Sequence, residues 1–170
     1  MILTIGAILL FGVFLNTSNQ LMIGNNQIAS QNEYYVTAIS LAQSVIDEAK
    51  MKAFDQKTVS AAVLSPDSLT TGGGLGTDNF GEVISSPDTA SNQIFQSVRR
   101  FNDVDDYNLY RRVVNTERAE GYQLAARVYY VSETNPDVAS AGKTYCKKMT
   151  VNVWSSYFPD TVKLYYAFTY

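Results

Sequence analysis

The sequence of 170 residues contains no histidine and a single cysteine, Cys146. Histidine is the commonest general base and the commonest metal ligand, so its absence removes most ways of building a catalytic or metal site. One cysteine excludes an internal disulfide, and a cysteine-based triad would lack its histidine partner. Cys146 lies in a strand-like run and is predicted to be a small buried or half-buried side chain. An enzyme is therefore the weakest functional class, and no cofactor is predicted.

Charge is also missing from the start of the chain, because residues 1–32 contain no Asp, Glu, Lys or Arg. Residues 1–15 are apolar apart from Thr4, so lipid or other copies of the chain must cover them. A signal peptide would have basic residues before this run and a small-residue cleavage site after it, and the sequence offers neither. A permanent transmembrane helix needs about 20 apolar residues, which this run does not reach. The pattern favours a helix that waits in the membrane and then enters a protein assembly.

In such an assembly identical helices lie side by side, and charged side chains would repel their own copies in a medium of low dielectric constant. A charge-free run avoids that repulsion. We expect the core of the assembly to consist of Ile2, Leu3, Ile5, Ile8, Leu9, Leu10, Phe11, Val13, Phe14 and Leu15.

A second helical pattern follows, in which apolar residues recur at three- and four-residue steps from Tyr35 to Ala53. Its apolar stripe comprises Tyr35, Ala38, Ile39, Ala42, Ile46, Ala49 and Ala53. We expect this helix to end near Phe54-Asp55. Between Asn16 and Asn26 polar side chains and Gly24 are poor helix formers, which predicts a loosened helix there; the alternative is an unbroken helix with a polar collar.

Residues 58–97 are rich in Gly, Pro, Ser, Asp and Asn, which is typical of turns and loops. The run from Gly72 to Gly76 lacks the Lys-Ser/Thr of a phosphate-binding loop and is predicted to be a surface loop. We expect the apolar side chains of this region to attach it to the core, namely Phe80, Val83, Ile84, Ile94, Phe95 and Val98.

Asp103, Asp105 and Asp106 form the densest acidic cluster of the sequence. The preferred interpretation is a structural turn whose carboxylates cap backbone N–H groups and pair with the neighbouring Arg99-Arg100 and Arg111-Arg112. A calcium site is the alternative, because three carboxylates supply hard oxygen ligands, although the Gly and distal Glu of an EF-hand loop are missing. The net charge is −3 and basic patches with interleaved aromatic residues are absent, which argues against nucleic-acid binding.

The last third of the chain alternates apolar and polar residues over 122–131, 149–154 and 162–168, a pattern typical of half-buried antiparallel strands. The sequence therefore predicts an α+β fold, in which a long N-terminal helix packs against an antiparallel meander β-sheet. The expected parts are an apolar assembly or membrane helix (1–32), the half of the helix that packs on the head (33–57), and a globular head with a loop-rich middle and a sheet (58–170).

Four segments in this order resemble type IV pilins and pseudopilins: the uncharged N-terminal run, LAQSVIDEAKMKAFD at 41–55, NDVDDYN at 102–108 and KMTVNVW at 148–154. The resemblance implies a structural subunit that waits in the bacterial inner membrane. Assembly machinery then draws it into an extracellular filament of self-associated helices on the cell surface. In the family a leader is removed and the new amino terminus is methylated, and this sequence resembles the mature form.

Two positions depart from the family pattern, because Ile5 stands where Glu is usual and Met1 replaces an aromatic residue. The usual Glu meets the terminal amine of a neighbouring subunit, and tip-type minor subunits also lack it. A low-copy minor pilin or pseudopilin that primes or tips a secretion or DNA-uptake apparatus is therefore the alternative. A membrane-tethered binding head is a third possibility, for which no ligand is specified.

Overall fold

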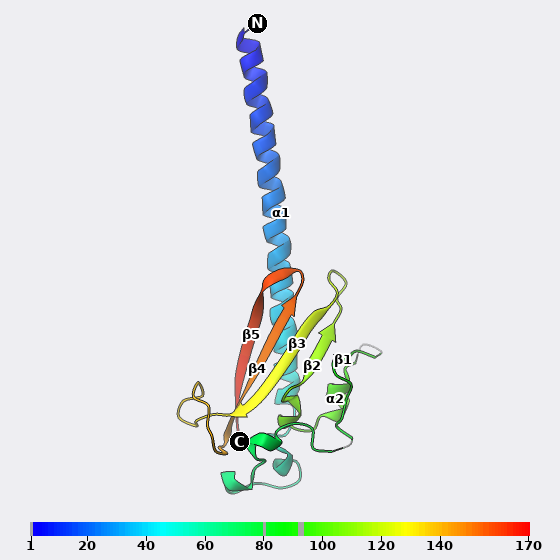
Figure 1. Ribbon diagram of the computed structural model, residues 1–170, viewed down its shortest axis with the longest axis vertical. Helices are drawn as coiled ribbons and strands as arrows, with labels where there is room; N and C mark the ends of the chain where they lie inside the picture. Colours follow the sequence, from blue (N-terminus) through cyan, green and yellow to red (C-terminus); the bar gives the residue numbers. More distant parts are fainter. Residues whose placement is uncertain (1, 80, 92–93) are drawn as a thin grey trace.

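The computed structural model describes residues 2–79, 81–91 and 94–170, with side chains described from Thr4 onward. A single long helix, α1 (Ile2–Lys50), projects its N-terminal half away from a head that packs against one side of its C-terminal half (Figure 1). The described part of the chain also contains short 3₁₀ turns at Gln56–Thr58, Pro66–Ser68, Gly72–Gly74 and Asp105–Tyr107, and the short helix α2 (Gln96–Arg100). The prediction of an α+β fold with a long N-terminal helix is confirmed.

The predicted loosening of the helix between Asn16 and Asn26 is wrong, because α1 is continuous from Ile2 to Lys50. One polar side chain shows how the helix accommodates this segment: Thr17 Oγ1 donates to the carbonyl oxygen of Val13, one turn back, at 2.9 Å. This bond satisfies the hydroxyl without opening the backbone ladder. The alternative of an unbroken helix with a polar collar describes the structure.

The helix ends at Lys50, about one turn before the predicted end near Phe54-Asp55. Two backbone bonds explain the early end, because Ala53 N donates to Asn102 O at 3.1 Å and Val104 N donates to Ala53 O at 2.9 Å. Ala53 thus pairs with the acidic turn instead of continuing the helix.

The described strands form one sheet in the order β1-β2-β3-β4-β5. Their bounds are β1 (Asp88–Thr89), β2 (Arg111–Val114), β3 (Tyr122–Tyr130), β4 (Cys146–Ser155) and β5 (Phe158–Thr169). The pairs β2-β3, β3-β4 and β4-β5 are antiparallel, as the predicted meander requires, whereas β1 pairs with β2 in parallel. The strands β1 and β2 were not predicted, since neither is long enough to show alternation. Strand β5 begins at Phe158 and includes Pro159, which an edge strand tolerates.

Strands β4 and β5 pack on the face of α1 that carries Ala38, Ala42 and Ala49, all fully buried. The small side chains let the sheet approach the helix closely. Val45 is buried beside them, while Ile39, which the apolar stripe included, is 46% exposed on the far side. The sheet contributes the predicted inward residues Leu124, Ala126, Val128, Met149, Val151 and Val153, all buried. Cys146 is buried too, as predicted.

The loop-rich middle is attached differently from the prediction. Val83, Ile94 and Val98 are exposed, and only Ile84 of the expected set packs against the buried core. Phe95 lies under the Arg112 guanidinium, 4.0 Å from ring centroid to Cζ, and Phe80 lies outside the described residues. The buried anchors are instead Leu69 and Leu75, which stand between turns and show no periodicity. The glycines from Gly72 to Gly74 are exposed, as the surface-loop prediction for Gly72 to Gly76 required, but Leu75 within that run is buried.

Candidate assembly surface and buried charge networks

No residue from Thr4 to Glu33 is buried in the described structure. The predicted assembly residues with described side chains are all exposed, up to 74% for Leu10: Ile5, Ile8, Leu9, Leu10, Phe11, Val13, Phe14 and Leu15. The side chains of Ile2 and Leu3 lie outside the described residues. By length and composition, α1 is long and apolar enough to cross a membrane. A helix surface with so many exposed apolar side chains requires lipid or another protein to cover it.

The exposed apolar surface of α1 does not stop where the head begins. We call the residues Phe11, Phe14, Leu21, Met22, Ile28, Val36 and Ile39 the back stripe; at 100° per residue they lie within one sector of about 120° around α1, which excludes the buried Ala38 and Ala42. Val36 is 63% exposed and Ile39 46% exposed, although both lie in the section of the helix that carries the head. The back stripe therefore runs for about 42 Å at about 1.5 Å per residue. The sequence did not predict that Val36 and Ile39 belong to this exposed stripe. Ile39 was assigned to the apolar stripe that packs on the head, and Val36 was not assigned.

Near Glu33, which pairs with Arg118 of the head, two aromatic contacts join α1 to the head: Tyr34 with Tyr157 (5.0 Å between centroids) and Tyr35 with Phe158 (4.8 Å). These rings fix the β4-β5 turn against the helix. From Tyr34 to Lys50, one side of α1 belongs to the head and the other remains open.

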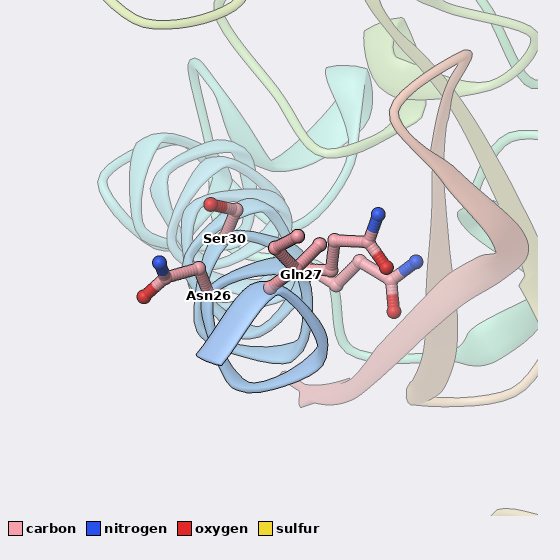
Figure 2. A pocket seen from close by; sticks show the side chains of 5 residues that line it. Asn26, Gln27 and Ser30 are labelled. Carbon is pink, nitrogen blue, oxygen red and sulfur yellow. The ribbon is translucent and has the colours of Figure 1, made fainter. Parts of the chain in front are cut away.

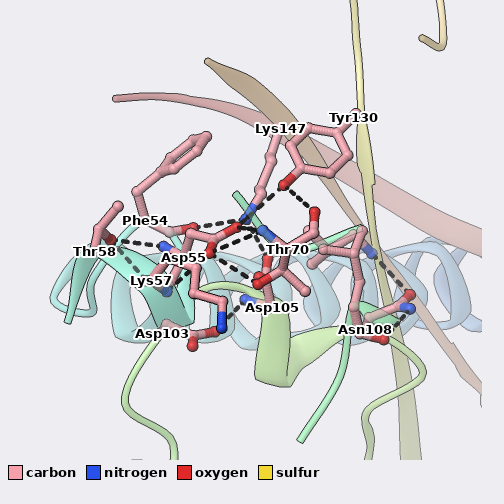
Figure 3. A network of polar contacts seen from close by, with 12 residues as sticks. Phe54, Asp55, Lys57, Thr58, Thr70, Asp103, Asp105, Asn108, Tyr130 and Lys147 are labelled. Atoms are coloured by element: carbon pink, nitrogen blue, oxygen red, sulfur yellow. Dashed lines mark hydrogen bonds and ion pairs between the residues drawn. The ribbon is translucent and has the colours of Figure 1, made fainter. Parts of the chain in front are cut away.

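Beyond the end of α1, a buried lysine of β4 joins the segment that follows the helix and the acidic turn to the sheet (Figure 3). Lys147 Nζ lies 2.7 Å from Asp55 Oδ2 and 2.5 Å from Asp105 Oδ1, and all three side chains have no exposed surface. Lys147 also donates to the carbonyl oxygen of Phe54 at 3.1 Å, and Tyr130 OH donates to Asp55 at 3.1 Å. Burial alone would raise the pKa of Asp55, yet the hydrogen bonds that Asp55 accepts from Lys147 and Lys57 lower that pKa to about 2.

The prediction that the acidic cluster is a structural turn is confirmed. Asp103 Oδ1 accepts from the backbone N–H groups of Asp105 (2.7 Å) and Asp106 (3.2 Å). Asp106 Oδ2 accepts from Asn102 N (2.9 Å) and Asp103 N (3.3 Å). Because these oxygens face the backbone, they do not converge; among the described residues no group of three or more His, Cys, Asp or Glu side chains is placed to hold a metal ion.

The predicted pairing of this cluster with the arginines is wrong. Arg112 instead reaches Glu48 of α1, with 2.5 Å between Nη2 and Oε2, and both side chains are buried. Tyr107 OH donates to the other oxygen of Glu48 at 2.8 Å. Arg100 donates to the carbonyl oxygen of Val83. The partner of Asp105 is Lys147, 42 residues away, which sequence proximity could not indicate.

We expect the stability of the head to fall as pH rises above about 4. Burial, and then the charges of Asp106 and Asp105, raise the pKa of Asp103 to about 8. The folded chain thus retains a proton that the unfolded chain releases near pH 4, so the free energy of unfolding decreases as pH rises from about 4 to about 8. Asp106, whose pKa burial raises to about 6, contributes the same sign below that value.

This pH dependence can be measured as the urea midpoint of the full chain in neutral detergent at pH 5 and pH 8. Asp103→Asn keeps the accepting oxygen and should reduce the drop between the two pH values. An equal drop in Asp103→Asn and parent would contradict the assignment to Asp103. Below pH 4 the lowered pKa of Asp55 acts with the opposite sign, so protonation of Asp55 should reduce stability.

No protein-family model, curated protein or solved structure matches the chain. The relation to pilins therefore remains a resemblance, which the long N-terminal helix followed by a sheet is compatible with.

Proposed function

We propose that the chain is a structural subunit that polymerises through α1 into an extracellular filament similar to type IV pili. Before assembly the apolar half of α1 would lie in the inner membrane, from which assembly machinery would transfer it to the filament at the cell surface. The single observation that supports a polymer most strongly is the back stripe, because it continues to Val36 and Ile39 beside the head.

A bilayer alone could not cover this surface. The hydrocarbon core of a membrane is about 30 Å thick, whereas Thr4 and Ile39 are separated by about 52 Å along a helix with about 1.5 Å rise per residue. Even if the span began at Thr4, it would end before Ile28. The rest of the back stripe needs a protein partner, and the uncharged helix of another copy supplies an apolar surface without like-charge repulsion.

The energy available to such packing is large. If each subunit buries roughly 1,000 Å² of apolar helix surface, the gain is on the order of 25 kcal/mol before the costs of ordering are subtracted. The free energy that remains after those costs is enough to hold a stable polymer. Chemistry plays no part in this function, since the proposed activity is helical self-assembly.

The substitution Val36→Asp separates a polymer from a simple membrane anchor. Val36 lies beyond the reach of a bilayer span that begins near Thr4, so the variant should enter the membrane normally. If copies pack along the back stripe, each subunit then buries a carboxylate, and the yield of sheared filaments should fall at least tenfold. Filaments are counted by electron microscopy and quantified by mass spectrometry.

The matched control is Val98→Asp, which places the same change at an exposed valine of α2 and should leave filament yield unchanged. Normal yield from Val36→Asp would contradict packing along the back stripe. The abundance of the chain in sheared filaments also tests the low-copy alternative: a repeating subunit should dominate the material, whereas a minor pilin or pseudopilin would be a trace component.

A further inference from the structure

The side of α1 that the sheet covers has a continuation above the head. Asn16, Gln20, Gln27 and Gln31 follow one another at steps of 4, 7 and 4 residues. The same alternation leads on to the buried Ala38, Ala42 and Ala49, so one 11-residue repeat unites both sets. A repeat of 11 residues in three turns stays on one side of an α-helix. We call the four exposed amides the amide stripe.

The amide stripe belongs to an uncharged, amide-rich segment. Residues 16–32 contain eight Asn and Gln side chains: Asn16, Asn19, Gln20, Asn25, Asn26, Gln27, Gln31 and Asn32. A shallow open hollow of about 570 Å³ lies along the end of the stripe nearest the head, lined by Ile23, Asn26, Gln27, Ser30 and Gln31 (Figure 2). Each amide both donates and accepts hydrogen bonds, which suits a polar protein surface and makes hydrocarbon a costly environment.

The two sides of this segment therefore have different chemistry. The back stripe offers Leu21, Met22 and Ile28, with Asn25 and Asn32 in the same sector, whereas the side of the amide stripe offers Asn16, Gln20, Gln27 and Gln31, with Ile23 and Gly24 at its edges. Apolar helices of neighbouring copies match the first side. They match the second less well, because packed apolar residues there would leave the four amides of the amide stripe without hydrogen-bond partners.

We propose that the amide stripe is the docking site for the head of a second copy, displaced along the helix axis toward the N-terminus. This inference rests on the proposed function. The head lies on the sheet side of its own helix and the amide stripe lies on that same side, so two parallel copies whose sheet sides face each other bring the head of one onto the amide stripe of the other. The lengths also match: the stripe extends about 22 Å from Asn16 to Gln31, and the head covers about 24 Å of α1 from Tyr34 to Lys50.

The test uses the photoreactive amino acid p-benzoylphenylalanine, placed in the full chain at Gln27 or at Met22. Assembled filaments are irradiated, covalent dimers are isolated by gel electrophoresis, and the joined peptides are identified by mass spectrometry. From Gln27 we expect most cross-links to reach residues 51–170 of the second copy. Met22, on the back stripe of the same segment, is the matched control and should reach residues 1–40 of another copy.

The outcomes separate this inference from the proposed function. If Gln27 joins mainly residues 1–33 of another copy, the amides pair between helices and the docking proposal is overturned, while polymerisation through α1 stands. If Gln27 is joined mainly to lipid, the proposal also fails. The absence of dimers from both positions would instead contradict the proposed filament itself.

Discussion

Replacing Leu10 with lysine should abolish filaments while leaving the head folded. Leu10 is 74% exposed and lies in a stretch of α1 that is apolar on all sides apart from Thr4. In the proposed filament it is buried among other copies, so Leu10→Lys loses about 1.5–3 kcal/mol of apolar burial in every subunit. The larger effect is the buried ammonium group, which has no carboxylate within the uncharged segment to pair with. Ile8→Asp should act in the same way through a buried carboxylate.

The measurement must distinguish failure to assemble from failure to enter the membrane. A lysine near the centre of a spanning helix costs about 2.5–3.5 kcal/mol of insertion free energy, which a long apolar helix can offset. We therefore expect Leu10→Lys subunits in the membrane fraction, with the parent's urea midpoint for the head, but no filaments in sheared material. The yield should fall by at least a hundredfold.

Leu64→Lys provides the control, because Leu64 is 95% exposed in a loop of the head and the substitution introduces the same charge. It should assemble normally. Filaments of normal yield from Leu10→Lys or Ile8→Asp would refute a core made of these helices. Leu10→Met, which conserves size and apolar character, should also assemble and shows whether charge or shape decides the result.

The elements that the sequence predicted well are those whose pattern repeats. Strands β3, β4 and β5 alternate over 122–131, 149–154 and 162–168, and α1 carries its alanine face over several turns, so periodicity alone located them. The strands β1 and β2 are too short for a period to appear. The continuity of α1 was mispredicted because propensity is a weak indicator, and the polar side chains of residues 16–26 are compatible with an unbroken helix.

The charge networks were missed for a different reason. Asp105 was assigned to nearby arginines because sequence distance was the only available guide, whereas its partner stands at the start of β4. One signal could have identified that partner. Lys147 lies at two-residue steps from Met149, Val151 and Val153, so its side chain had to point to the same face of the sheet, toward the core. A lysine there needs a buried acid as its partner. Which acid it would meet depends on the fold.

Replacing Lys147 with methionine should unfold the head or weaken it by about 3–5 kcal/mol, since removing one partner of a buried ion pair leaves an uncompensated charge. Here Asp55 and Asp105 would both be left without their cation. Methionine keeps much of the side chain's length and apolar stem, so the loss reports on charge more than on volume. The urea midpoint of the full chain in neutral detergent measures it, with ellipticity showing whether α1 remains helical.

Lys148→Met is the matched control, because the adjacent side chain points to the opposite side of the sheet and pairs with the exposed Asp137. It should leave the midpoint near the parent value.

A triple variant, Lys147→Met with Asp55→Asn and Asp105→Asn, removes the stranded charges and should recover more than half of the lost stability. If Lys147→Met alone matched the parent, the buried lysine would contribute nothing to the stability of the head. If the triple variant were no more stable than Lys147→Met, the loss would come from packing and lost hydrogen bonds. Recovery in the triple variant would instead establish that the segment after α1 and the acidic turn are held to β4 by charge compensation.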